Sequence, residues 1–433
     1  MTAEIAVFNK SAVALAADSA VTITGDGTHK IYNGAEKLFT LSKFHPVGVM
    51  IYGNGDICGA PWELAIKSYR SENGTRSFNS LKEWADNFLS FISENDSIVT
   101  EGMREKYLFN FHSSIILPAL INDVEKKAEA LSTERGEIIK TAEFYDLFIK
   151  YCTEFVTTLE GAPYFDGFDE DDLPEAAGIS DQYVDFLCTE QLRFDDEVIP
   201  FEIIELIKTI FTYTTCKKAP IGSRSGIVFA GYGDGEYYPV VLSYDILGFL
   251  GRKVRTIFNT SKSSLASEAN ILPYAQDQEV QLFLQGCYDE FLEHNSEVHE
   301  SCRQDIKNNF KEILIKYISP DDAEKELAVL DGLINDCVES TNTKINSFIN
   351  TNYIQKVISM LGFLPKQELA YMAESLVNLT AFKRKVSNEH ETVGGPIDVA
   401  IISKADGFIW VKRKHYFSRE LNHHFFVKHQ RDS

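Results

Sequence analysis

Three short stretches with β-strand patterns, separated by two long helical blocks, set the strongest limit on how this chain can fold. The strand stretches occupy residues 4–59, 226–246 and 394–413. In each of them short apolar runs are joined by turn signals such as Gly-Asp-Gly, a pattern typical of antiparallel hairpins. Hairpins covered by helices predict an α+β fold and argue against a doubly wound parallel sheet.

The two helical blocks cover residues 60–215 and 278–386, where Leu, Ile and Phe recur at helical spacing. The last helix is the clearest. From Leu369 to Val377 the apolar residues follow i, i+3, i+4, i+7, i+8 spacing, and Pro365 stands where a first-turn proline belongs. We therefore expect this helix to cover one face of a sheet.

The charge balance limits the partners of the chain. Lys and Arg number 42 and Asp and Glu number 64, so the net charge is 42 − 64 = −22. Such a charge disfavours nucleic acid and anionic membrane surfaces as partners. No apolar run approaches the roughly 20 residues of a membrane helix. The acidic run at residues 161–178, which contains Gly and Pro, is predicted to be an exposed, solvated loop rather than a docking element.

Cysteine and histidine usage gives no sign of a disulfide framework or a metal site. The seven cysteines form no C-x-x-C pair, and the sequence contains no phosphate-loop motif. We therefore expect no metal and no cofactor. A reducing, cytoplasmic setting is predicted, and the opening stretch lacks the cationic segment of a secretory signal.

Thr2, which directly follows Met1, is the first candidate for chemistry. If Met1 is removed, one residue supplies both a hydroxyl nucleophile and a free α-amine. That amine has an ordinary pKa of roughly 7.7–8.0, so it can act as a general base near neutral pH.

A threonine nucleophile of this kind also needs a cation near its hydroxyl, a carboxylate to hold the cation, and an oxyanion donor. Asp18 ends the second predicted strand, and Lys37 opens the next one in "KLFTLS". Adjacent antiparallel strands can place Thr2, Asp18 and Lys37 at one end of a sheet. Gly53 in "MIYGNGD" permits close approach of a backbone N–H to an oxyanion.

The stretch "TAEIAVFNKSAVALAADSAVT" resembles the start of proteasome β subunits and of the related bacterial ATP-dependent proteasome-like peptidase. Both belong to the N-terminal-nucleophile hydrolases. The segment "GSRSGIVFAGYGDGEYYPVVLSYD" resembles the central hairpin of that family. The segments "PKQELAYMAESL" and "GGPIDVAIISKADGFIWVK" resemble its last helix and strand pair. These matches occur in the order found in the family.

The resemblance implies a four-layer αββα sandwich and a role for each matched residue. Counted from Thr2 without a gap, Thr2 falls on the nucleophile and Asp18 on the family aspartate. Thr22 falls on the residue whose backbone pairs with the bound peptide. Lys37 matches the catalytic lysine if the preceding loop is longer by about three residues, and Gly53 matches the oxyanion glycine.

Lys30 is the alternative to Lys37; we prefer Lys37 because an apolar strand follows it. The chain also departs from the family near its end. The family has Asp-x-x-Ser before the final Gly-Gly, whereas "HETVGG" places His390 and Val393 there. His390, Glu389 or Glu391 could substitute for the missing groups, and a solvated loop pair is the other interpretation.

A second departure concerns the fifth strand, where the family has a serine in a loop of small residues. The corresponding segment here is "NILPYAQDQEV", with Tyr274 or Gln276 near that point. In the family these polar groups orient the terminal amine and the nucleophile, so their replacement bears directly on activity.

The resemblance divides the chain into a discontinuous core with helical insertions. The predicted core comprises residues 2–59, 222–277 and 362–417, the insertions residues 60–221 and 278–361, and the C-terminal tail residues 418–433.

The function predicted from these residues is N-terminal-threonine hydrolysis of amides or peptides, with Thr2, Lys37 and Asp18 as its chemistry. The resemblance implies a peptide or protein substrate, a homo-oligomer and an ATP-dependent unfoldase partner. Two alternatives stay open. One is a catalytically silent proteasome-like protein used in assembly or regulation, and the other is a small-molecule amidohydrolase of the same superfamily.

Overall fold

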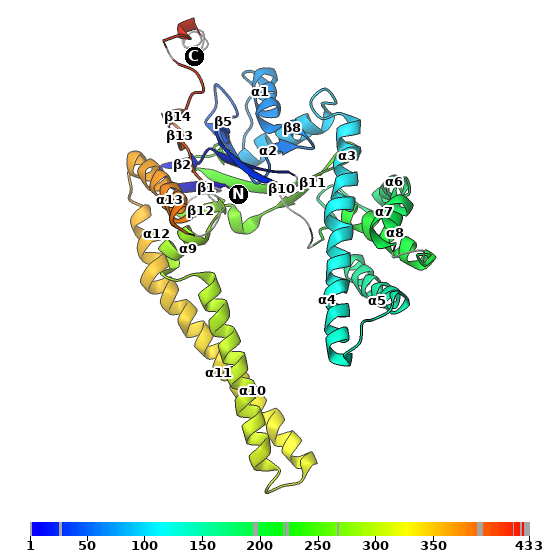
Figure 1. Ribbon diagram of the computed structural model, residues 1–433. Helices are drawn as coiled ribbons and strands as arrows, with labels where there is room; N and C mark the ends of the chain where they lie inside the picture. Colours follow the sequence, from blue (N-terminus) through cyan, green and yellow to red (C-terminus); the bar gives the residue numbers. More distant parts are fainter. Residues whose placement is uncertain are drawn as a thin grey trace. The chain divides into compact units, whose positions relative to one another are not determined.

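The computed structural model describes residues 2–25, 28–193, 198–219, 221, 225–265, 268–387, 393–418, 420–424 and 427 (Figure 1). Antiparallel strand pairs and many helices confirm the predicted α+β class. The chain divides into two compact units. Unit 1 comprises Met1–Gly34, Ala266–Ile401 and Ile409–Tyr416, and unit 2 comprises Ala35–Leu265, Ile402–Phe408 and Phe417–Ser433.

A five-stranded sheet forms the centre of unit 1. Its strands, in the order β12-β1-β2-β13-β14, are Asn270–Ala275, Ala3–Asn9, Ala12–Ala17, Asp398–Ser403 and Gly407–Lys412. Every residue of β1 and β2 is buried, which explains why both strands consist of small and apolar residues with few exceptions. Two further strands, β3 (Ala20–Gly25) and β4 (Thr28–Asn33), form a separate two-stranded ladder.

Helix α13 (Lys366–Val386) covers one face of this sheet, as the apolar spacing predicted. Its buried stripe includes Leu369, Ala373 and Val377, which pack on the odd-numbered side chains of β1 and the even-numbered ones of β2. Pro365 is the N-cap residue rather than the first helical residue, one position earlier than predicted. Helix α9 (Gln278–Gln285) packs beside α13.

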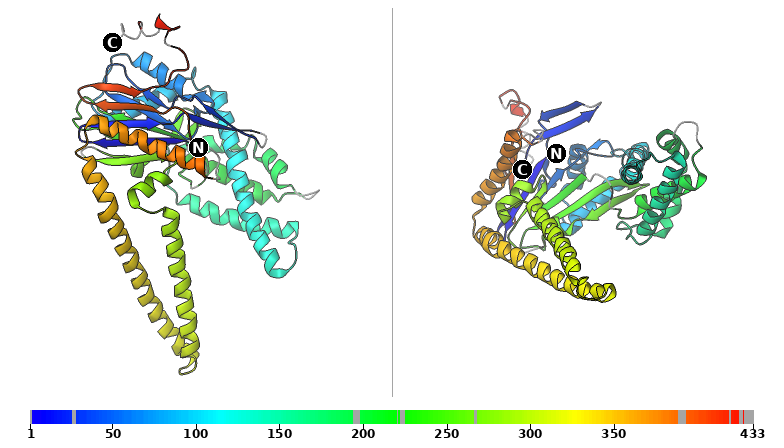
Figure 2. Two further views of the ribbon diagram at one scale, coloured as in Figure 1. Left: turned by 60° about the vertical axis from the view of Figure 1, so that its left-hand side comes forward. Right: turned by 60° about the horizontal axis from the view of Figure 1, so that its bottom comes forward.

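Unit 1 also carries a long helical hairpin made of α10 (Asp289–Leu314) and α11 (Pro320–Ile349). The two helices run side by side away from the sheet of unit 1 in both figures (Figures 1 and 2). A short π-helical turn (Asn350–Ile354) and α12 (Gln355–Leu361) connect the hairpin back toward α13.

Unit 2 has its own five-stranded sheet. In the order β11-β10-β9-β6-β5 the strands are Lys253–Phe258, Val240–Leu250, Ser225–Gly231, Val47–Tyr52 and Leu38–Thr40. The predicted central hairpin is the β9–β10 pair, with antiparallel register. Helices α1 (Trp62–Asn73) and α2 (Leu81–Glu94) pack on this sheet through Trp62, Trp84 and Phe88. The short strands β7 (Asp56–Ile57) and β8 (Ala60–Pro61) precede α1.

The remaining helices of unit 2 form a second apolar core that contacts the end of β10. They are α3 (Glu101–Phe111), a π-helical turn (His112–Ile116), α4 (Leu117–Arg135), α5 (Thr141–Glu160), α6 (Leu173–Ser180), α7 (Val184–Leu192) and α8 (Phe201–Cys216).

The predicted exposed loop at residues 161–178 is wrong for its second half. A 3₁₀ turn (Glu170–Asp172) leads into α6, and Asp172 is 7% exposed. The Asp172 carboxylate accepts a hydrogen bond from the Asp169 N–H and another from Lys253 Nζ at 2.7 Å. The acidic run therefore leads into a helix, where negative charge is favourable. Asp172 is buried, whereas the other acidic residues of the run are exposed, as predicted.

No helix in the described part of the chain combines the length and the apolar character needed to cross a membrane. The discontinuous core, the two helical insertions and the four-layer stacking of the sheets stay predictions.

Candidate active site

Thr2 lies at the start of β1 with its side chain 5% exposed. Its hydroxyl donates a hydrogen bond to Glu4 Oε2 at 3.0 Å, and its carbonyl accepts one from the Gln276 N–H at 3.1 Å. Glu4 is completely buried. The nucleophile predicted from the sequence thus has a carboxylate acceptor in direct contact.

Strand geometry explains why these two side chains meet. Successive side chains of a strand point to opposite faces, so residues two apart share a face. Ala3 and Ile5 pack toward α13, which leaves Thr2 and Glu4 on the other face. Glu4 is paired in register with Tyr274 of β12, which is also buried. Glu4 is not among the residues predicted from the sequence, although a carboxylate inside the apolar strand "AEIAVFN" was the available signal.

Asp18 ties three segments of unit 1 together. Its Oδ1 accepts the Ala3 N–H at 3.1 Å, and its Oδ2 accepts the N–H groups of Ala20 at 3.2 Å and Gly394 at 2.9 Å. Its own N–H donates to the Ala3 carbonyl at 3.1 Å. Hydrogen bonds to an ionised carboxylate are stronger than neutral ones. The Asp18 side chain therefore fixes the start of β1, beside Thr2, against the loop before β13.

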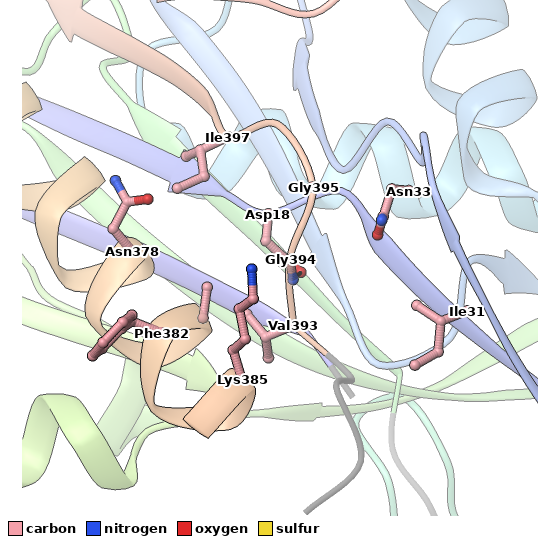
Figure 3. Close-up of a pocket in the computed structure, with 11 residues that line it drawn as sticks. Asp18, Ile31, Asn33, Asn378, Phe382, Lys385, Val393, Gly394, Gly395 and Ile397 are labelled. Atoms are coloured by element: carbon pink, nitrogen blue, oxygen red, sulfur yellow. Dashed lines mark hydrogen bonds between the residues drawn. The ribbon is translucent and has the colours of Figure 1, made fainter. Parts of the chain in front are cut away.

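Next to Asp18, unit 1 contains a cavity of about 540 Å³ (Figure 3). Ile31 and Asn33 of β4 line one side of the cavity, and Asn378 and Phe382 of α13 line the other. Figure 3 shows the Lys385 side chain extending from the last turn of α13 toward the loop at Gly394. Polar groups of Asp18, Asn33, Asn378 and Lys385 line this cavity as much as apolar side chains do, so it offers both kinds of contact to a small ligand or a substrate side chain.

Tyr274 and Gln276, the two polar residues singled out in "NILPYAQDQEV", lie at the end of β12 and directly after it. Ala275 pairs with Ala3 and has φ of +60°, a conformation that a side chain other than glycine rarely adopts. This turn directs the Gln276 N–H to the Thr2 carbonyl. Strained backbone conformations of this kind are concentrated at functional sites.

Lys37 and Gly53 belong to unit 2, where they lie at the same end of the β5–β6 ladder. The Lys37 carbonyl accepts the Ile51 N–H at 2.9 Å, and Gly53 follows two residues later with φ of +80°. Lys37 is 4% exposed, whereas its competitor Lys30 is exposed on β4. The choice of Lys37 over Lys30 as the catalytic lysine stays a prediction.

The structure therefore brings the predicted site residues together in two pairs. Thr2 and Asp18 lie together in unit 1, both next to Ala3, and Lys37 and Gly53 lie together in unit 2. Convergence of the two pairs on one point stays a prediction.

Thr22 lies on β3, where its backbone pairs with Ile31 of β4. Among the described strands β3 pairs with β4 alone, which leaves its second edge for an added strand. The predicted substitutes His390, Glu389 and Glu391 lie outside the described residues. Val393, in the position of the family serine, packs in the apolar core beneath α13.

Within the described ranges, no group of three or more His, Cys, Asp or Glu side chains is arranged to hold a metal ion.

Comparisons with known proteins give little guidance on this site. No family model matches the chain, and no curated protein matches it. Among solved structures, one of Anbu from Hyphomicrobium sp. strain MC1 matches 99% of this chain and 95% of its own, with 9% identity and a TM-score of 0.28. A second, of the Anbu Gly-1 mutant, matches 100% and 96%, with 9% identity and a TM-score of 0.27. Similarity at this level does not establish the fold or the function of this chain.

Proposed function

We propose that this chain is an N-terminal-threonine amide or peptide hydrolase in which Thr2, exposed by removal of Met1, is the nucleophile. One observation carries the proposal: the buried Thr2 hydroxyl donates to the buried Glu4 carboxylate at 3.0 Å. That distance lies within the reach expected of a general base. A hydroxyl held against a carboxylate at a strand end is poised for nucleophilic attack.

In the proposed reaction, Thr2 Oγ1 attacks the carbonyl carbon of the scissile amide. The hydroxyl proton passes to the Glu4 carboxylate or to the α-amine of Thr2, and then to the leaving amine as the C–N bond breaks. Water hydrolyses the resulting ester, which releases the acid and restores the hydroxyl. The contact with Glu4 makes it a base candidate beside the terminal amine.

The other predicted residues take supporting roles in this proposal. Asp18 fixes the backbone next to the nucleophile through the Ala3 N–H. Lys37 supplies positive charge near the hydroxyl, the Gly53 N–H stabilises the oxyanion, and the β3 edge at Thr22 pairs with an extended substrate. This proposal requires the two sheets to stack in a four-layer sandwich. It also extends to a proteasome-like homo-oligomer with an ATP-dependent unfoldase partner.

A catalytically silent assembly or regulatory protein is the second candidate, and one observation favours it. Asp18 accepts hydrogen bonds from three backbone N–H groups, which gives this residue a structural role that needs no catalysis. Burial of Val393 in the apolar core, in place of the family serine, agrees with that interpretation.

Covalent labelling distinguishes the two candidates. The purified protein is first analysed by intact mass to establish whether Met1 is removed, and is then treated with an epoxyketone or β-lactone probe. We expect one adduct on the wild type and on Thr133→Ala, which removes an exposed hydroxyl on α4, and none on Thr2→Ala. An adduct that persists on Thr2→Ala, or its absence from wild type lacking Met1, would overturn the proposal.

Substrate class is tested separately on protein that the probe labels. Fluorogenic peptide amides and small N-acyl amides are compared by kcat/KM. We expect the peptide amides to be preferred, because an added substrate strand can pair with β3. A preference for the small amides would instead support the small-molecule amidohydrolase.

A further inference from the structure

Polar side chains join the two helices of the α10–α11 hairpin at several points. Arg303 donates to Asn335 Oδ1 at 2.6 Å, and Lys307 Nζ lies 3.4 Å from Asp331 Oδ2. None of the residues of α10 is buried, and α11 buries only two, near the turn that joins the helices. Partly exposed ion pairs each contribute about 0–1 kcal/mol, so these contacts stabilise the hairpin little. Ala323 and Leu327 are the only buried residues of α10 and α11, so the hairpin has almost no apolar core of its own.

The apolar side chains of α10 instead form an exposed stripe beside that contact. Its members recur at helical spacing and fall within an arc of about 120° on a helical wheel. They are Phe291, Val298, Cys302, Ile306, Phe310 and Ile313.

Helix α11 presents a matching stripe, made of Val329, Leu333, Cys337 and Phe348. Ile306 is 49% exposed and Leu333 is 63% exposed, although both are large apolar side chains.

The two stripes border one groove along the hairpin. A cavity of about 360 Å³ lies between them, lined by Cys302 and Ile306 from α10 and by Leu333 and Cys337 from α11. The α10 residues that line this cavity run from 299 to 306, about 12 Å at 1.5 Å per residue, and the exposed apolar stripe continues beyond them on both sides along α10. An apolar groove between two parallel ridges is the shape that receives the apolar face of an amphipathic helix.

Charge identifies the kind of helix that fits. Residues 289–349 contain 6 Lys and Arg and 14 Asp and Glu, so the hairpin carries 6 − 14 = −8. A second copy of the hairpin would bring another −8 against it, and like charges across an interface are costly. A helix with Lys and Arg beside its apolar stripe would cover the exposed apolar side chains and would also pair with the negative charge of the hairpin.

We propose that the groove between α10 and α11 is a docking site for a basic amphipathic helix of a partner protein. The apolar face of that helix covers the stripes, completing the core that the hairpin lacks, and its cationic flanks face the acidic residues of α10 and α11. This site is independent of the chemistry proposed for Thr2.

The test uses a labelled Leu/Lys peptide with amphipathic helical spacing, about as long as α10, and the full chain. Fluorescence anisotropy gives its Kd for the wild type, for the double variant Ile306→Asn/Leu333→Asn, and for Tyr317→Asn. Both groove residues are about half exposed or more, so the variant is expected to keep its fold, which circular dichroism checks. Tyr317 lies in the turn between the helices and is 81% exposed.

We expect the double variant to bind at least tenfold more weakly and Tyr317→Asn to bind like the wild type. A scrambled peptide of equal charge and a Leu/Glu peptide should bind at least tenfold more weakly to the wild type, and affinity should fall as salt rises. Equal binding of the scrambled peptide or of the double variant would overturn the proposal. So would a wild-type dimer in sedimentation that the double variant lacks, because the occupant would then be a second copy.

Discussion

The Thr2 hydroxyl donates to the Glu4 carboxylate at 3.0 Å, and both side chains are buried. Strand alternation places the two side chains on one face, because residues two apart along an extended chain point the same way. The pair gives the predicted nucleophile a proton acceptor that does not depend on a free N-terminus.

Glu4→Gln tests whether Glu4 takes the proton in turnover. The amide keeps the size and one hydrogen-bond acceptor of the carboxylate but is not a base. We expect kcat to fall by about 10²–10⁴-fold, the usual contribution of general base catalysis, while probe binding and the melting temperature change little. Glu279→Gln, at a buried glutamate on α9, serves as the matched control and should keep wild-type kcat.

The pH profile of the same variant separates the two candidate bases. If the terminal amine is the base, Glu4→Gln retains an acid limb in the profile near the roughly 7.7–8.0 of a free α-amine. If Glu4 is the base, the acid limb of the wild type is lost in the variant together with its activity. An unchanged rate and profile in Glu4→Gln contradict a role for Glu4 in proton transfer.

Asp18→Asn should destabilise unit 1 by about 3 kcal/mol, because it removes the charge that accepts three backbone N–H groups and turns one oxygen into a donor. Chemical denaturation measures the free energy of unfolding. Asp166→Asn is the control, since Asp166 is 61% exposed and pairs with Lys218 at the surface. A stability loss no larger than that of the control would mean that these hydrogen bonds contribute little.

Lys37→Met should abolish turnover, while Lys30→Met should leave it within about twofold of the wild type. Lys37 is buried at the strand end that also carries Gly53, whereas Lys30 is exposed on β4. Because the loss of a positive charge beside the hydroxyl affects chemistry more than binding, we expect the change in kcat rather than in KM. Full activity in Lys37→Met together with its loss in Lys30→Met would transfer the assignment to Lys30.

Local patterns predict the elements of this fold better than its long-range contacts. The β9–β10 hairpin and α13 follow from turn signals and apolar spacing, which act over a few residues. The bond from the Gly394 N–H to Asp18 joins residues 376 positions apart, and no local pattern encodes it. Alternation gives the face of Glu4 but not its neighbour, so the sequence does not predict its contact with Thr2. The second half of the acidic run was predicted to be a loop, because acidic residues occur in exposed loops as well as in the first turn of a helix.

His112 should make the stability of unit 2 fall on acidification. Burial, reinforced by the positive charge of Arg255, holds the pKa of His112 well below its usual range. The ring stacks on Phe211, with Nδ1 2.7 Å from the Tyr183 hydroxyl and Nε2 3.1 Å from the Thr215 hydroxyl. The folded state therefore keeps a neutral imidazole at a pH where the unfolded chain binds a proton.

The sign follows from proton linkage. Below about pH 6.5 the unfolded state binds one more proton at this position than the folded state, so the free energy of unfolding decreases as the pH falls. Between pH 7.5 and 5.5 we expect His112→Gln to lose about 1.4 kcal/mol less than the wild type. His294→Gln, at a histidine that is 73% exposed, should lose as much as the wild type. Urea denaturation at the two pH values measures each difference, and equal losses in His112→Gln and the wild type would show that His112 does not carry this pH dependence.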